Sequence, residues 1–146
     1  MLRFAENDWI ILEKSQGNAL LITKECVAKK AYKDGWEKGD LTWENSDIYS
    51  YLQYEFPTEL ILYKKHLTNV NGCCASLLSG TEFTKYEQYI PTIGSPWWLR
   101  DTVLNSLQGN TKYFAQAVYK NEVKSWHASQ TDVGVRPIIR FAFEDM

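Results

Sequence analysis

Cysteine, histidine and long apolar runs are scarce in this chain of 146 residues. Its three cysteines, Cys26, Cys73 and Cys74, are an odd number with one adjacent pair, which suits neither a disulfide framework nor the paired spacings of a zinc site. Reduced thiols in a cytoplasmic protein are the simplest interpretation. The two histidines, His66 and His127, are far apart, and no spacing suggests a nucleophile–base–acid set. We therefore expect no enzyme, no metal and no cofactor.

Neither a membrane nor a nucleic acid is an expected partner. No stretch approaches the roughly 18 apolar residues of a membrane span, and charges interrupt residues 1–8, unlike a signal peptide. The net charge is −2, and no basic cluster exceeds Lys29-Lys30 or Lys64-Lys65. Proteins that follow a phosphate backbone concentrate more lysine and arginine than this.

Aromatic residues, in contrast, are abundant: they make up 14% of the chain and include six Trp and nine Tyr. Such side chains fill cores, and they also suit interfaces because Tyr and Trp carry a polar group. The chain has an ordinary domain length and no visible repeat or linker. We predict a single domain over residues 1–146.

Three helix starts are predicted in the middle of the chain. Asn45 or Ser46 can cap a helix whose following apolar residues share a face. A second helix is expected after Pro57, because proline is favoured at the first helical position. The third signal is the sharpest: Ser79 as N-cap and Glu82 three residues later form a capping box.

Segments typical of strands flank these helices. Residues 9–12 and 19–23 predict a hairpin about a glycine-containing turn, and the following residues 24–39 look irregular. The second half adds strand-like runs at 97–100, 114–119, 123–126 and 134–143. Strands at both ends and helices between them indicate an α+β fold. In that fold the N-terminal hairpin and the C-terminal strand can share one sheet.

The order of these motifs resembles the bacterial family known as domain of unknown function 6273. The motifs are Trp9 with its strand, Ala19–Ile22, Thr42–Leu52, Leu77–Ser79 with Glu82 and Tyr86, Trp97–Arg100 and Gly134–Pro137. That family is similar to the formylglycine-generating-enzyme branch of C-type-lectin-like folds, which includes variable ligand-binding proteins of diversity-generating retroelements. The resemblance implies a single C-type-lectin-like domain whose ligand surface lies between the last two motifs.

The enzymes of that branch use residues that this chain lacks. The copper-dependent ones use a cysteine pair near the C-terminal end, and no cysteine follows Cys74 here. The sulfoxide synthases use a set of histidines for iron, whereas this chain has two in all. The chain also departs from the family pattern at Tyr49, Tyr51 and Asp101. The resemblance therefore implies a binding module and carries over no particular ligand.

The expected binding surface is aromatic and lies in the C-terminal half. Its candidate residues are Trp98, Arg100, Tyr113, Tyr119, Trp126 and His127. Because side chains alternate across a strand, one of Trp97 and Trp98 should enter the core and the other should face outward or into a cleft. Arg136 is expected to be buried with Glu82 as its partner, which would clamp the closing strand to the capped helix.

The leading hypothesis is a non-enzymatic binding module for a protein or a carbohydrate. Two alternatives remain open. One is a phage or mobile-element inhibitor or accessory protein that blocks a host protein. The other is a small enzyme that uses the Cys73-Cys74 pair.

Overall fold

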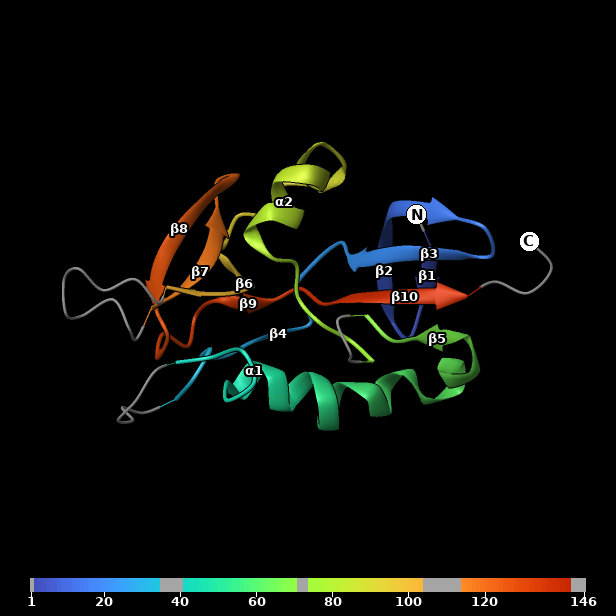
Figure 1. The fold of residues 1–146 in the computed structure, drawn as a ribbon, viewed down its shortest axis with the longest axis horizontal. Coiled ribbons are helices and arrows are strands. Elements are labelled where there is room, and N and C mark those ends of the chain that lie inside the picture. Colours follow the sequence, from blue (N-terminus) through green and yellow to red (C-terminus); the bar gives the residue numbers. More distant parts are fainter. Residues whose placement is uncertain (1, 35–40, 71–73, 104–113, 143–146) are drawn as a thin grey trace.

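The described residues contain two five-stranded sheets, and helical segments lie on either side of them (Figure 1). The computed structural model describes residues 2–34, 41–70, 74–103 and 114–142. The fold is α+β, as predicted. Sheet A has the strand order β1 (Leu2–Phe4), β2 (Asn7–Ser15), β3 (Asn18–Thr23), β10 (Ile138–Ala142) and β5 (Leu67–Thr68). Sheet B has the order β4 (Ala28–Lys29), β9 (Gly134–Val135), β6 (Trp97–Val103), β7 (Phe114–Tyr119) and β8 (Glu122–His127).

The predicted N-terminal hairpin is confirmed, and the predicted strand-like runs 114–119 and 123–126 form a second hairpin. Strands β2 and β3 pair antiparallel, as do β7 and β8. The β7–β8 turn has two residues with positive φ, Lys120 at 53° and Asn121 at 63°. Such a pair of left-handed residues matches the twist of the flanking strands, which explains the tight connection. The segment predicted to be irregular contains β4, and residues 35–39 of it lie outside the described residues.

The C-terminal strand is split between the two sheets, whereas the sequence predicted one continuous strand to residue 143. β9 pairs with β4 and β6 in sheet B, and β10 pairs with β3 in sheet A. The break falls at Arg136-Pro137, because proline cannot donate a ladder hydrogen bond and restricts the residue before it. The expectation that the N-terminal hairpin and the C-terminal strand share a sheet is confirmed by the β3–β10 pairing. Phe143 lies outside the described residues.

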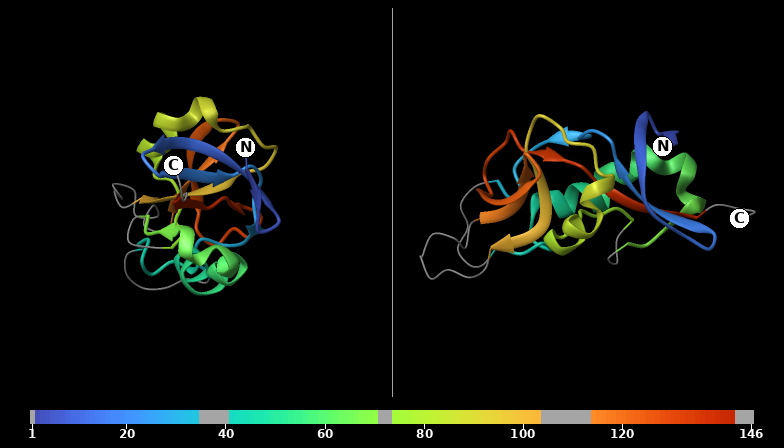
Figure 2. Two further views of the ribbon diagram at one scale, coloured as in Figure 1. Left: turned by 90° about the vertical axis from the view of Figure 1, so that its right-hand side faces the viewer. Right: turned by 90° about the horizontal axis from the view of Figure 1, so that it is seen from above.

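Helical segments cover opposite sides of the molecule (Figures 1 and 2). A run of α1 (Asp47–Ser50), η1 (Tyr51–Glu55, a π-helix) and η2 (Phe56–His66, a 3-10 helix) follows the lower edge in Figure 1. α2 (Gly80–Tyr86) and η3 (Glu87–Tyr89) lie at the top. Ser46 is the first N-cap, since its Oγ accepts a hydrogen bond of 3.0 Å from the Tyr49 N–H. In the described part of the chain, no helix is long and apolar enough to cross a membrane.

Both tryptophans of the Trp97-Trp98 pair are buried, with 3% and 0% of their surfaces exposed. They do alternate across β6: Trp97 joins a core cluster with Phe83, and Trp98 joins a second cluster with Trp9. The prediction that one of them faces outward is wrong, because packed side chains cover both faces of β6. Trp98 is therefore no surface binding residue, and its indole N–H donates a hydrogen bond of 2.8 Å to the Lys30 carbonyl.

Arg136 is fully buried, as predicted, but its partners are backbone carbonyls and not Glu82. Its guanidinium donates to the carbonyl oxygens of Thr23 at 2.8 Å, Lys24 at 2.6 Å and Pro91 at 3.0 Å. The guanidinium carbon also lies 5.0 Å from the centre of a Trp97 ring. Arg136 thus ties the break between β9 and β10 to the end of β3. The side chain turns toward the end of β3 at this break, and between it and Glu82, both of which the structure describes, no hydrogen bond or ion pair is found.

Candidate functional site

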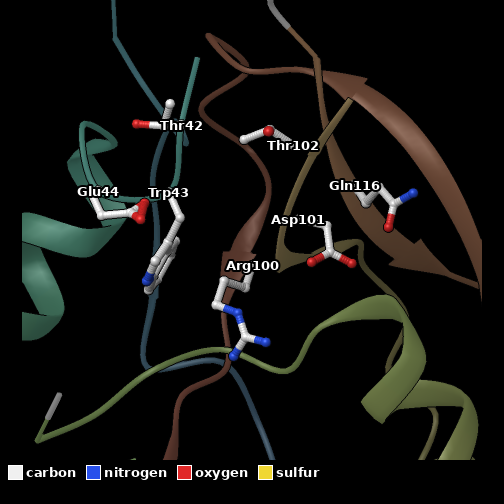
Figure 3. Close-up of a pocket in the computed structure, with 7 residues that line it drawn as sticks. All are labelled: Thr42, Trp43, Glu44, Arg100, Asp101, Thr102 and Gln116. Carbon is white, nitrogen blue, oxygen red and sulfur yellow. The ribbon is translucent and has the colours of Figure 1, made fainter. Parts of the chain in front are cut away.

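A groove with mostly polar walls lies between β6, β7, the start of α2 and the segment Thr42–Glu44 (Figure 3). Its larger hollow has a volume of about 580 Å³ and is lined by Thr42, Trp43, Glu44, Arg100, Asp101, Thr102 and Gln116. A second hollow of about 380 Å³ is lined by Gly80, Thr81, Thr84, Asp101, Gln116 and Val123. Asp101 and Gln116 line both hollows, so we name the combined feature the Asp101–Gln116 groove.

An irregularity in β6 places Arg100 and Asp101 at this groove. The pairing of β6 with β7 shifts register between Trp98 and Thr102. In this irregular part of β6, the Arg100 N–H donates a hydrogen bond of 2.8 Å to the carbonyl of Leu78, a residue outside the sheet. The Arg100 carbonyl accepts a hydrogen bond of 2.6 Å from the Tyr32 hydroxyl. Bulges of this kind redirect side chains and are frequent beside binding sites.

The Tyr32 hydroxyl keeps its proton for this bond. Burial raises the pKa of Tyr32 well above its usual range, and the nearby charge of Asp101 adds to the effect. Tyr32 therefore acts as a fixed donor beneath the irregular part of β6.

Asp101 joins the strand to the start of α2. Its Oδ2 accepts a hydrogen bond of 2.8 Å from the Gly80 N–H, a favourable place for a negative charge because helix N-termini carry unpaired N–H groups. Gly80 also keeps the groove open: a Cβ atom there would lie 3.0 Å from Gln116 Oε1 and 3.3 Å from Asp101 Oδ2. The predicted capping box is present immediately beside it.

Arg100 is held at the edge of the groove by α2 and the segment before it. Its Nη2 lies 3.5 Å from Glu82 Oε1, and its Nη1 donates to the Leu77 carbonyl at 3.3 Å. The side chain remains 22% exposed. Glu82 thus pairs with Arg100, whereas the sequence had assigned it to Arg136.

The opposite wall of the groove supplies one aromatic ring. In Figure 3, Trp43 and Glu44 lie on one side, and Asp101 and Gln116 lie on the other. Trp43 is half-buried and packs against Tyr32 and Tyr49, with ring centroids 6.2 Å and 5.6 Å apart. The indole is therefore anchored from behind while part of it remains exposed in the groove.

The aromatic residues predicted to form one surface are divided between two faces of the β7–β8 hairpin. Tyr119 and Trp126 come together, with ring centroids 6.1 Å apart and planes nearly perpendicular. Trp126 lies opposite Ala115, and the next residue, His127, lies opposite Phe114. Because successive side chains of a strand point to opposite faces, His127 is on the other face of the hairpin from Trp126. The His127 Nδ1 accepts a hydrogen bond of 3.2 Å from the Ser129 N–H.

The remaining predicted binding residues lie elsewhere. Arg100 lines the groove, Trp98 is in the core, and Tyr113 lies outside the described residues. Sequence reasoning therefore identified one groove residue and missed the others. The Thr42-Trp43-Glu44 motif and the unusual Asp101 were visible in the sequence, but nothing there pointed to Gln116.

The cysteines give no support to a redox or metal site. Cys26 is a half-buried free thiol, and burial raises its pKa above the usual value. Cys74 is half-buried, and Cys73 lies outside the described residues, so the adjacent pair stays a hypothesis. Among the residues that are described, no group of three or more His, Cys, Asp or Glu side chains could hold a metal ion.

The groove combines hydrogen-bond donors and acceptors on rigid elements with one indole, an arrangement suited to holding a polar ligand. Comparison of the chain with protein-family models, curated proteins and solved structures finds no match.

Proposed function

We propose that this chain is a non-enzymatic binding module that holds a carbohydrate in the Asp101–Gln116 groove. The observation that carries the proposal is the position of Asp101 and Gln116, which line two adjoining hollows opposite the indole of Trp43. The hydrogen bond from Gly80 holds the Asp101 carboxylate in place, and strand β7 carries Gln116. Such fixed groups lose little entropy when a ligand binds.

The lining chemistry favours a carbohydrate over a protein side chain. Sugar hydroxyls both donate and accept, and the groove offers carboxylate, amide, hydroxyl and guanidinium groups that can meet them. An indole face suits the apolar C–H side of a sugar ring. Protein interfaces usually place apolar residues in the centre and polar residues at the rim. Most of the residues that line this groove are polar.

We propose that the α+β fold is C-type-lectin-like, in keeping with the resemblance to the bacterial domain of unknown function 6273. Support comes from the β3–β10 pairing, which joins the N- and C-terminal segments in one sheet, and from the capping box of α2. A cytoplasmic location belongs to the same proposal and agrees with the free thiol of Cys26.

A glycan array probed with the purified full chain tests the carbohydrate proposal, followed by calorimetric titration of a captured glycan. Gln116→Ala should weaken binding at least roughly tenfold, because a buried hydroxyl of the ligand would lose its partner. Ser125→Ala is the matched control. Ser125 lies directly opposite Gln116 on β8, is exposed and lines neither hollow. Absence of any glycan binding, or equal affinity of Gln116→Ala and wild type, would contradict the proposal.

A protein partner is the second candidate, favoured by the Tyr119–Trp126 pair. The indole nitrogen of Trp126 is buried without a hydrogen-bond partner among the described residues, and aromatic residues of this kind often anchor protein interfaces. Capture of a host protein that is lost in Trp126→Ala and retained in Gln116→Ala would favour this candidate over the groove.

A further inference from the structure

The 3-10 helix η2 exposes two large aliphatic side chains to solvent on its outer face. Leu62 is 85% exposed and Ile61 is 66% exposed, and Tyr54 in the preceding turn is 75% exposed. A 3-10 helix has three residues per turn, so side chains three apart line up in rows. From Pro57 onward, exposure in η2 follows this period: the row Pro57, Leu60, Tyr63 and His66 is buried or half-buried, and the other two rows are exposed, whereas Phe56 at the start of η2 is buried.

The inner row is fixed to sheet A. The Tyr63 ring lies 4.9 Å from that of Phe4, and the His66 ring stacks on Phe141 at 5.1 Å. The His66 Nδ1 also lies 3.2 Å from the Ala142 carbonyl oxygen. These contacts determine which side of η2 faces away from the molecule. None of the residues on that outer side lines the Asp101–Gln116 groove.

Charge is arranged asymmetrically along the outer rows. One row reads Glu59, Leu62 and Lys65, and the other reads Thr58, Ile61 and Lys64. In the first row, Glu59 precedes Leu62 by three residues and Lys65 follows it by three. At about 2 Å of rise per residue, both charges lie about 6 Å along the axis from Leu62. The row is therefore complementary in charge to a copy of itself that runs in the opposite direction.

We propose that the outer face of η2 docks onto the same face of a second copy of this chain, about a two-fold axis through Leu62. In this arrangement the two Leu62 side chains meet at the axis, and Glu59 of each copy lies opposite Lys65 of the other. A two-fold interface makes each contact twice, so both charge pairs form together. A parallel arrangement would place lysine against lysine, which the charges oppose.

The size of the apolar face sets the strength of this dimer. Leu62 and Ile61 offer on the order of 200 Å² or slightly more per copy, less than the roughly 800 Å² per partner of a standard interface. A weak dimer, with a micromolar or weaker dissociation constant, follows from that area. Two grooves in one assembly would raise the apparent affinity for a ligand with repeated units, but the dimer itself does not depend on the groove.

Sedimentation velocity of the full chain, from about 10 µM to about 1 mM, tests the proposal. Wild type should pass from monomer to dimer over this range. Leu62→Glu should raise the dissociation constant at least roughly tenfold, because it buries two like charges at the axis. Tyr89→Glu is the control, since Tyr89 is also exposed, at 52%, but lies on η3. It should leave the dimer unchanged.

The charge pattern provides a second and more specific test. Glu59→Lys and Lys65→Glu should each weaken self-association, because each places like charges opposite one another. An equimolar mixture of the two variants should associate more strongly than either alone, since one copy then offers only lysines and the other only glutamates. A wild type that stays monomeric, a dimer indifferent to Leu62→Glu, or a mixture no stronger than its components would overturn the proposal. Thermal unfolding of each variant, measured alongside, separates a loss of self-association from a loss of folded protein.

Discussion

The carboxylate of Glu82 lies 3.5 Å from the guanidinium of Arg100 while it also accepts a 2.8 Å hydrogen bond from the Ser79 N–H. One side chain therefore caps α2 and holds the arginine of β6 at the edge of the groove. The capping hydrogen bond joins residues three apart in the sequence, whereas the ion pair with Arg100 joins α2 to β6. A single carboxylate thus couples the start of a helix to the candidate binding site.

This double role predicts different effects for two substitutions of Glu82. Glu82→Gln keeps an acceptor at the N3 position, so the capping box survives and the free energy of unfolding should change little. Glu82→Ala removes the cap partner as well and should cost about 1 kcal/mol. Urea unfolding of both variants measures the difference. Equal losses in the two variants would show that the charge on Glu82, and not its capping hydrogen bond, stabilises this region.

Trp98 offers a prediction about the core. Trp98→Phe keeps an aromatic ring in a fully buried site but leaves the Lys30 carbonyl without its indole donor. We expect a loss of about 1–3 kcal/mol in the free energy of unfolding, with ligand binding retained. Chemical denaturation and the glycan titration check the two parts. A surface role would give the opposite result, unchanged stability and impaired binding.

The acid side of the stability profile should depend on Tyr86. Its hydroxyl donates a 2.7 Å hydrogen bond to Glu13 Oε2, and this bond lowers the pKa of Glu13. A carboxyl whose pKa is lower in the folded state adds stability above its unfolded pKa, and that stability is lost as the pH falls through the folded value. Tyr86→Phe should therefore flatten the decline in stability below the usual glutamate pKa. Thermal unfolding across acidic pH measures it, and an identical decline in both proteins would contradict the assignment.

Local signals in the sequence predicted much of the fold. The Ser79–Glu82 capping box, the Ser46 cap and the two hairpins each involve residues a few positions apart, and each is present. The α+β class followed from their order. The split of the C-terminal strand is not among the predictions, although Pro137 marks it. The apolar residues on both sides of the proline predict one continuous strand.

The candidate site was harder to predict because its residues meet only through tertiary contacts. Arg136 is held by three backbone carbonyls and Arg100 by Glu82. All of these partners lie in segments that only the fold brings together with the arginines, so the local sequence does not identify them. Gln116 lies between two buried alanines on β7 and becomes a groove residue through its position beside Arg100, Asp101 and the glycine at the start of α2.

Gly80 provides the sharpest test of whether the groove itself binds. Gly80→Ala adds one methyl group 3.0 Å from Gln116 Oε1 and 3.3 Å from Asp101 Oδ2, so both groove side chains must shift by a few tenths of an ångström. Alanine is the better helix former, which offsets part of that crowding, and stability should change little. Glycan affinity should fall, because the added methyl group narrows the smaller hollow and displaces the amide that faces the ligand. Paired calorimetric titration and urea unfolding separate the two effects. If Gly80→Ala binds glycan as wild type does and Ser125→Ala does not, the ligand contacts β8 at Ser125 instead of the Asp101–Gln116 groove.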